Sequence, residues 1–144
     1  MNLRSKSGDI YLFKGPCLLK INNGKFQAVG KVLESPERVT IPKGKSISVE
    51  TVADGELMVE FEEGGEREQL SERTIPDSWD RLAGELSRQG ARIILILGET
   101  DTGKTFFSSY LANKLLDYGL KVGILDCDTG QSDIGPPGTI GLAV

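Results

Sequence analysis

Residues 98–105 read Gly98-Glu99-Thr100-Asp101-Thr102-Gly103-Lys104-Thr105, which fits the phosphate-binding pattern G-x-x-x-x-G-K-[ST]. An apolar run, Ile93 to Leu97, leads into this stretch and is typical of a strand buried on both faces. The residues that follow place apolar side chains at helical spacing, at Phe107, Tyr110, Leu111 and Leu115. Strand, glycine loop and helix are the context that this motif requires. The sequence therefore predicts a triphosphate-binding loop in the second half of the chain.

The residue types in this loop suit triphosphate chemistry. Gly98 and Gly103 allow the backbone to wrap closely, so that several N–H groups point at phosphate oxygens. The following helix adds the positive end of its dipole. Lys104 places a charge on the β- and γ-phosphates, and the Thr105 hydroxyl can bind Mg²⁺. We therefore predict that residues 98–105 bind the cofactor and that Lys104 is also catalytic.

Composition narrows the classes of function. The chain has 144 residues, a formal net charge of −4 and no histidine, so carboxylates and lysine must supply any acid–base chemistry. The net charge argues against a broad nucleic-acid-binding face on this chain, although a local basic groove stays possible. Cys17 and Cys127 lie in different halves, which favours a reducing cytoplasm, or the nucleus in a eukaryote. No apolar run approaches the length of a membrane span, and no membrane association is expected.

Residues 9–70 are predicted to form short strands, because apolar and polar residues alternate in them with period two. The alternation is clearest around Val49 and around Val59. Four turns are predicted at hairpin spacing, at residues 22–24, 42–44, 53–55 and 63–65. We expect a small antiparallel β-sandwich or barrel. The acidic residues of this half are interpreted as a solvated face rather than a metal site; they are Glu60, Glu62, Glu63, Glu66 and Glu68.

The sequence pattern changes after residue 74 from the alternation typical of strands to the spacing typical of a helix. Asp77 is a candidate helix N-cap, with Asp80 three residues on as a weak capping box, and Gly90 is a candidate terminator. Trp79 shares an apolar helical stripe with Leu82, Ala83 and Leu86, so it is interpreted as a core residue rather than a base-stacking platform. From residue 91 the order strand, loop, helix, strand predicts a parallel α/β sheet. The expected fold is α+β in two parts: a β-domain at 1–74, then at 75–144 a linker helix and the start of a P-loop domain.

Two carboxylates follow the second predicted strand, Lys121 to Leu125. Asp126 and Asp128 come at its carboxyl end, and ligands of parallel α/β sheets lie beyond the carboxyl ends of the strands. Both carboxylates are therefore expected beside the phosphate loop as metal-binding candidates, together with Thr105. Asp128 is the favoured inward-facing group, although Asp126 shares its face if the strand continues that far.

A family resemblance rests on two stretches. Residues 126–141 read DCDTGQSDIGPPGTIG, and residues 100–105 read TDTGKT. A D-x-G-Q stretch followed closely by P-G-T, a short way after T-D-x-G-K-[ST], resembles the polynucleotide 5′-hydroxyl kinases. These include archaeal RNA and DNA kinases, a eukaryotic messenger-RNA cleavage-factor subunit and ribosomal-RNA-processing kinases. The β-rich first half also fits, because the family has an amino-terminal β-domain joined by a helix to its P-loop domain.

The resemblance implies roles for individual residues. Lys104 and Thr105 would serve ATP and Mg²⁺, Asp128 would orient or deprotonate the attacking 5′-hydroxyl, and Gln131 would help to position the γ-phosphate or the metal shell. Lys45 is a candidate for a contact to adenine. This chain departs from the family at Phe106, where many members have a second hydroxyl residue that contacts the α-phosphate.

The implied function is transfer of the γ-phosphoryl group of ATP to the 5′-hydroxyl of RNA or DNA, in RNA processing or repair. The chain resembles an amino-terminal portion of such a kinase, so the nucleic-acid groove and the lid arginines are expected after Val144. The 144 residues alone are therefore expected to be inactive. Two alternatives stay open: an ATP-binding scaffold subunit of an RNA-processing complex without turnover, and a regulatory P-loop GTPase.

Overall fold

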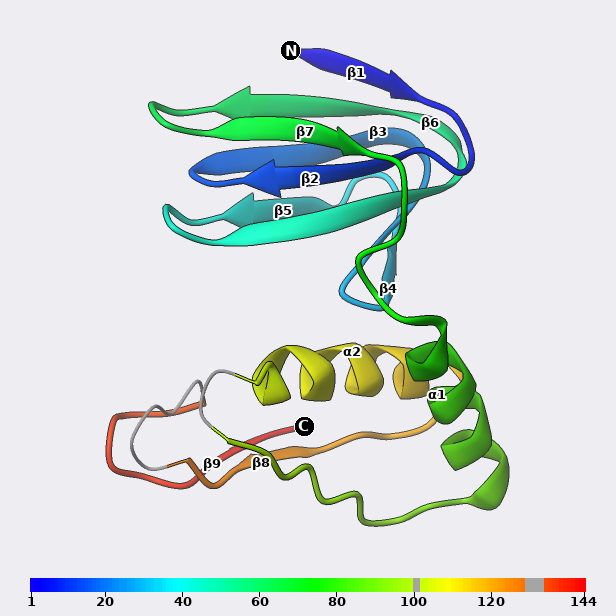
Figure 1. Cartoon of the computed structure of the whole chain (residues 1–144), viewed down its shortest axis with the longest axis vertical. Coiled ribbons are helices and arrows are strands. Elements are labelled where there is room, and N and C mark those ends of the chain that lie inside the picture. The colour runs from blue at the N-terminus through cyan, green and yellow to red at the C-terminus, as the bar shows by residue number, and fades with distance from the viewer. Residues whose placement is uncertain (100–101, 129–133) are drawn as a thin grey trace. The chain divides into compact units, whose positions relative to one another are not determined.

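The chain folds into two compact units, Met1–Pro76 and Asp77–Val144 (Figure 1). The computed structural model describes residues 1–99, 102–128 and 134–144. The first unit consists of antiparallel strands, and the second contains two helices and a short strand pair. This confirms the predicted α+β fold class, a β-rich first part followed by the start of a P-loop part.

The first unit is one antiparallel sheet built on two long strands. Its strands are β1 (Asn2–Ser5), β2 (Ile10–Lys14), β3 (Cys17–Ala28), β4 (Lys31–Leu33), β5 (Arg38–Ile41), β6 (Ser46–Phe61) and β7 (Glu66–Leu70). β3 and β6 pair with each other along most of their length. The first half of β6 pairs with β2 and its second half with β1, while β5 and β4 pair with successive halves of β3. Each long strand thus contributes to two parts of the sheet.

Two predicted turns, residues 22–24 and 53–55, are wrong because they lie inside β3 and β6. The β3–β6 register shifts there, between Ile21 and Phe26, as at a β-bulge. Gly24 and Gly55 face each other across the bulge, and a Cβ on Gly24 would lie only 2.5 Å from the Gly55 Cα. Only glycine allows two backbones to approach this closely. The turns expected at 42–44 and 63–65 do connect successive strands, β5 to β6 and β6 to β7.

One hydrophobic core spans both parts of this sheet. Leu19, Leu57 and Val59 lie on one side of the bulge and Phe26 and Val49 on the other, and all belong to the same buried cluster. Burial of the alternate residues Val49, Leu57 and Val59 agrees with the predicted period-two pattern. Strands that change sheets at bulges are a known way to close a β-sandwich over its core.

The acidic residues of the first unit form ion pairs on its surface. Lys20 pairs with Glu60 across β3 and β6, and hydrogen bonding by Lys20 holds the pKa of the Glu60 carboxyl below its ordinary value. Lys14 lies 3.5 Å from Glu66 and 3.9 Å from Glu68. In the described residues no group of three or more His, Cys, Asp or Glu side chains is arranged to hold a metal ion. Glu60, Glu66 and Glu68 are exposed as well as ion-paired, which agrees with their interpretation as part of a solvated face.

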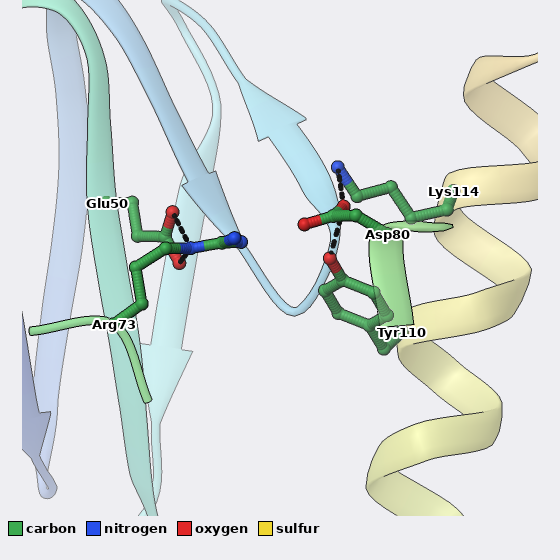
Figure 2. A network of polar contacts seen from close by, with 5 residues as sticks. All are labelled: Glu50, Arg73, Asp80, Tyr110 and Lys114. Atoms are coloured by element: carbon green, nitrogen blue, oxygen red, sulfur yellow. Dashed lines mark hydrogen bonds and ion pairs between the residues drawn. The ribbon is translucent and has the colours of Figure 1, made fainter. Parts of the chain in front are cut away.

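A further ion pair ties the end of β7 to β6. Arg73 lies just after β7, and its Nε lies 3.0 Å from both carboxylate oxygens of Glu50 (Figure 2). Both side chains are largely buried, at 30% and 18% exposure, which strengthens the pair relative to one in open water. The chain therefore leaves the sheet from a fixed position.

The second unit consists of α1 (Asp77–Gln89), α2 (Lys104–Asp117), β8 (Ile124–Asp126) and β9 (Gly141–Ala143). Ala83, Leu111 and Leu115 form the core between the helices, with Leu86 and Phe107 packed against it. Gly90 and Gly119 follow the helices with φ of 65° and 79°, a conformation that favours glycine at helix ends. In the described part of the chain no helix is long and apolar enough to cross a membrane.

The structure differs from expectation in the sheet of this unit. Residues 91–99 form no strand, and Ile93, Leu95 and Leu97 are 92%, 78% and 80% exposed. β8 pairs antiparallel with β9, a strand that the sequence pattern did not predict. A buried parallel strand requires a hydrogen-bonded neighbour, and no described strand pairs with residues 91–99.

Candidate triphosphate site

The phosphate loop closes on one carbonyl oxygen. The backbone oxygen of Glu99 accepts hydrogen bonds from Thr102 Oγ1 at 2.8 Å and from Lys104 Nζ at 2.6 Å. Lys104 therefore bends back over the loop instead of extending into solvent. An ammonium group has three donors, so a phosphate oxygen over the loop can bind Lys104 in addition to this carbonyl or in its place.

The two glycines of the motif have different roles. A Cβ on Gly98 would lie 2.8 Å from Thr102 Oγ1 and 3.5 Å from Lys104 Cδ, so glycine makes room for both side chains. Gly103 is the N-cap of α2 with φ of 83°, and no side chain caps the helix there. The first turn closes with a 2.9 Å bond from the Phe107 N–H to the Gly103 oxygen. The N–H groups of residues 104–106 consequently point out of the helix end, where an anion can accept them.

The linker helix α1 is fixed to the phosphate-loop helix α2 by a partly buried polar network. Asp80 Oδ1 accepts a hydrogen bond from the Tyr110 hydroxyl at 2.7 Å and forms an ion pair with Lys114 Nζ at 3.0 Å (Figure 2). Tyr110 is completely buried. The sequence interpretation of Asp80 as part of a capping box missed this role, since its partners lie 30 or more residues away.

An aromatic cluster lies beside this network. The Trp79 ring centroid is 4.6 Å from that of Phe107, 5.4 Å from that of Tyr110 and 6.1 Å from that of Phe106. Trp79 thus packs against the first two turns of α2, in agreement with its interpretation as a core residue. Together with Asp80, this packing orients the helix whose first residues are Lys104 and Thr105.

The carboxylates after β8 differ in their surroundings. Asp126 accepts the Asp128 N–H at 3.0 Å through Oδ1 and the Ile134 N–H at 3.3 Å through Oδ2. Asp126 is half-buried, whereas Asp128 is exposed. β8, the segment 91–99 and the beginning of α2 all reach the same side of the second unit (Figure 1). The carboxylate of Asp126 therefore fixes the backbone at Asp128 and Ile134, and the side chain of Asp128 is exposed.

Gly141 is a second anchor of this loop that sequence reasoning left without a role. It pairs with Asp126 in the β8–β9 ladder, and a Cβ placed on it would overlap the Ile134 oxygen. Gly141, two residues after the P-G-T stretch at 137–139, thus has a steric reason to be glycine.

Three predicted site residues, Thr100, Asp101 and Gln131, lie outside the described residues, as does most of the D-x-G-Q stretch. Lys45 lies in the first unit, in the turn before β6, and is exposed. Its contact to adenine stays a prediction, as do the roles assigned to Lys104, Thr105, Asp126 and Asp128.

The described residues fit a magnesium triphosphate. Gly98 makes room for the side chains of Thr102 and Lys104, Lys104 supplies the cation, and Thr105 offers an exposed hydroxyl in the first turn of α2. Mg²⁺ prefers oxygen ligands and usually takes few from the protein, the rest coming from phosphate and water. The hydroxyl of Thr105 and the carboxylates of Asp128 and Asp126 are oxygen ligands of this kind, and their role in holding the metal stays a prediction.

Known proteins are similar to parts of this chain. Residues 98–144 match the family model described as the mRNA cleavage and polyadenylation factor CLP1 P-loop. The polyribonucleotide 5′-hydroxyl-kinase of Methanocaldococcus jannaschii is 54% identical over 67 residues, which is 46% of this chain and 19% of that protein. The human polynucleotide 5′-hydroxyl-kinase NOL9 is 45% identical over 53 residues, 37% of this chain and 8% of that protein. The chain resembles the polynucleotide 5′-hydroxyl kinases, as its motifs predicted.

These kinase relatives are matched over a small part of their length. The polyribonucleotide 5′-hydroxyl-kinase of Pyrococcus furiosus is 53% identical over 51 residues, 35% of this chain but only 14% of the kinase. Among solved structures, the complex of wild-type Clp1p with a Pcf11p fragment matches 99% of this chain and 35% of that chain, with a TM-score of 0.74 and 18% identity. This likeness extends the shared fold to the β-rich first unit as well.

Proposed function

We propose that the protein containing this sequence is an ATP-dependent polynucleotide 5′-hydroxyl kinase that acts in RNA processing or repair. The observation that supports this most is the loop itself. Lys104 bends over a glycine-lined loop at the start of a helix, within the segment that matches the CLP1 P-loop family model, in a chain similar to proteins named as 5′-hydroxyl kinases.

In this proposal the chain binds ATP through the loop. The N–H groups at the start of α2 and Lys104 bind the phosphate oxygens, and Gly98 leaves the room that the Lys104 side chain needs over the loop. Thr105 and a carboxylate after β8 hold the metal. Mg²⁺, when bound, neutralises charge on the β- and γ-phosphates.

The chemical step is an in-line displacement. The 5′-hydroxyl oxygen of RNA or DNA forms a bond to the γ-phosphorus while the bond from that phosphorus to the β–γ bridging oxygen breaks, and ADP leaves. Asp128, exposed beyond the end of β8, accepts the hydroxyl proton. Lys104 stabilises the charge that develops on the transferred group.

The test is phosphate transfer from γ-labelled ATP to a 5′-hydroxyl oligonucleotide by the full-length protein. Lys104→Ala should lower ATP affinity by about 10- to 150-fold, since hydrogen bonds to charged groups contribute about 1.5–3 kcal/mol, and should abolish measurable transfer. Lys121→Ala is the matched control, because Lys121 is an exposed lysine of the same unit outside the loop. Unchanged ATP affinity in Lys104→Ala would refute the assignment of the loop.

A second candidate function is that of a subunit of an RNA-processing complex that binds ATP but does not turn it over. It is supported by the match to the P-loop of a messenger-RNA cleavage and polyadenylation factor. The same assay separates the two functions. ATP binding that depends on Lys104, without transfer to RNA or DNA, would favour the subunit.

A further inference from the structure

Two consecutive phenylalanines at the start of α2 have different surroundings. Phe107 packs against the core between the helices, whereas Phe106 is 39% exposed. The Phe106 ring centroid lies 6.1 Å from that of Trp79, at an interplanar angle of 49°. Phe106 therefore presents a large apolar surface to solvent directly after Lys104 and Thr105, and Trp79 supports it from α1.

The order of groups along a triphosphate places the nucleoside near this ring. In a phosphate loop, Lys104 reaches the β- and γ-phosphates and Thr105 the metal between them, while backbone N–H groups hold the α- and β-phosphates. The N–H of Phe106 belongs to the outward-pointing set at the helix end. The α-phosphate is the one bonded to the sugar, so a side chain next to it lies at the nucleoside end of the ligand.

We propose that Phe106, supported by Trp79, is the surface on which the base of the bound nucleoside triphosphate stacks. An aromatic ring suits any base, because every base has a π-face. Trp79 is held in turn by its edge contacts with Phe107 and Tyr110, so the supporting ring is fixed before the ligand binds. The inference rests on the proposed triphosphate site and adds a determinant of affinity for the nucleoside part.

The experiment compares two ligands, ATP and inorganic tripolyphosphate, which shares the phosphates but has no base. Binding of each to the full-length protein is measured by calorimetry in the presence of Mg²⁺. Phe106→Ala should weaken ATP binding by about 5- to 150-fold, the range that corresponds to loss of one base–aromatic stack, and leave tripolyphosphate binding unchanged. Phe106→Tyr, which keeps the ring, should bind ATP like the wild type.

Leu116→Ala is the matched control, because Leu116 is an apolar side chain of the same helix, 51% exposed and remote from the loop. It should change neither affinity. Equal weakening of both ligands by Phe106→Ala, or no change in either, would overturn the stacking role. A wrong assignment of the triphosphate site would give a different result, because Lys104→Ala would then bind both ATP and tripolyphosphate as tightly as the wild type. A thermal melt of Phe106→Ala verifies that the variant is folded.

Discussion

Asp126 and Asp128 are two positions apart but have different surroundings: Asp126 binds the backbone, whereas Asp128 is exposed. Asp126 uses both carboxylate oxygens to accept backbone N–H groups, from Asp128 and Ile134. Its charge strengthens those bonds. The side chain of Asp128 is exposed beyond the strand end, where a substrate can reach it. The order of residues favoured Asp128 as the inward-facing group, whereas in the structure Asp126 is half-buried and Asp128 is exposed.

We expect Asp126→Asn to weaken the hydrogen bonds that the side chain accepts from the backbone at Asp128 and Ile134. Asparagine keeps one carbonyl acceptor but loses the charge and the second oxygen, so amide hydrogen exchange at Asp128 and Ile134 should accelerate by about fivefold or more. Asp117→Asn, at the exposed end of α2, should leave both amides unchanged. Identical exchange in wild type and Asp126→Asn would show that other contacts hold the loop.

At the scale of elements, the sequence predicted those features that depend on local pattern. The apolar stripe of α2, the glycines that end both helices and the two turns at 42–44 and 63–65 all follow from spacing and residue type. The bulge between β3 and β6 was mistaken for two turns, because Asn-Gly and Asp-Gly pairs favour both structures and only the pairing partner distinguishes them. The partners of Asp80 could not be predicted from the sequence either, because they depend on how the two helices pack.

The bulge yields a matched pair of glycine variants. Gly24 and Gly44 have φ of 83° and 78°, but a Cβ at Gly24 would meet the Gly55 backbone, whereas a Cβ at Gly44 has open space. Gly44→Ala should cost about 1–2 kcal/mol, the price of a left-handed conformation for alanine. Gly24→Ala should cost about 3 kcal/mol or more. Urea unfolding followed by circular dichroism tests this, and equal costs would contradict the close approach.

The joint between α1 and α2 can be tested by removing one hydroxyl. Tyr110→Phe leaves the ring in place but removes the 2.7 Å bond to Asp80, and should destabilise the second unit by about 1–2 kcal/mol. Tyr118→Phe is the control, because Tyr118 is 52% exposed and should change stability by less than about 0.5 kcal/mol. Trp79 is the single tryptophan of the chain and lies against Tyr110, so its fluorescence reports this unfolding directly. Equal stability of the two variants would argue against the network.

At the scale of the whole molecule, the change from period-two alternation to helical spacing along the sequence corresponds to a β-rich unit followed by a helical unit with a phosphate loop. The domain bounds 1–74 and 75–144 stay a prediction. The parallel sheet was expected from the order of elements, but it requires neighbouring strands that residues 91–99 do not have among the described residues. The phosphate loop was predictable because its chemistry is local: eight consecutive residues contain the glycines, the lysine and the threonine.

The central claim is that this loop and the carboxylates after β8 transfer phosphate to a 5′-hydroxyl. It is tested most directly by comparing wild type and Asp128→Asn in the full-length protein, measuring ATP affinity and transfer from γ-labelled ATP to a 5′-hydroxyl oligonucleotide. We predict that the wild type transfers phosphate, and that Asp128→Asn keeps its ATP affinity within about threefold while transfer falls by about 100-fold or more, as expected for loss of a general base. Transfer by Asp128→Asn at the wild-type rate, or ATP binding by the wild type without any transfer, would contradict the account.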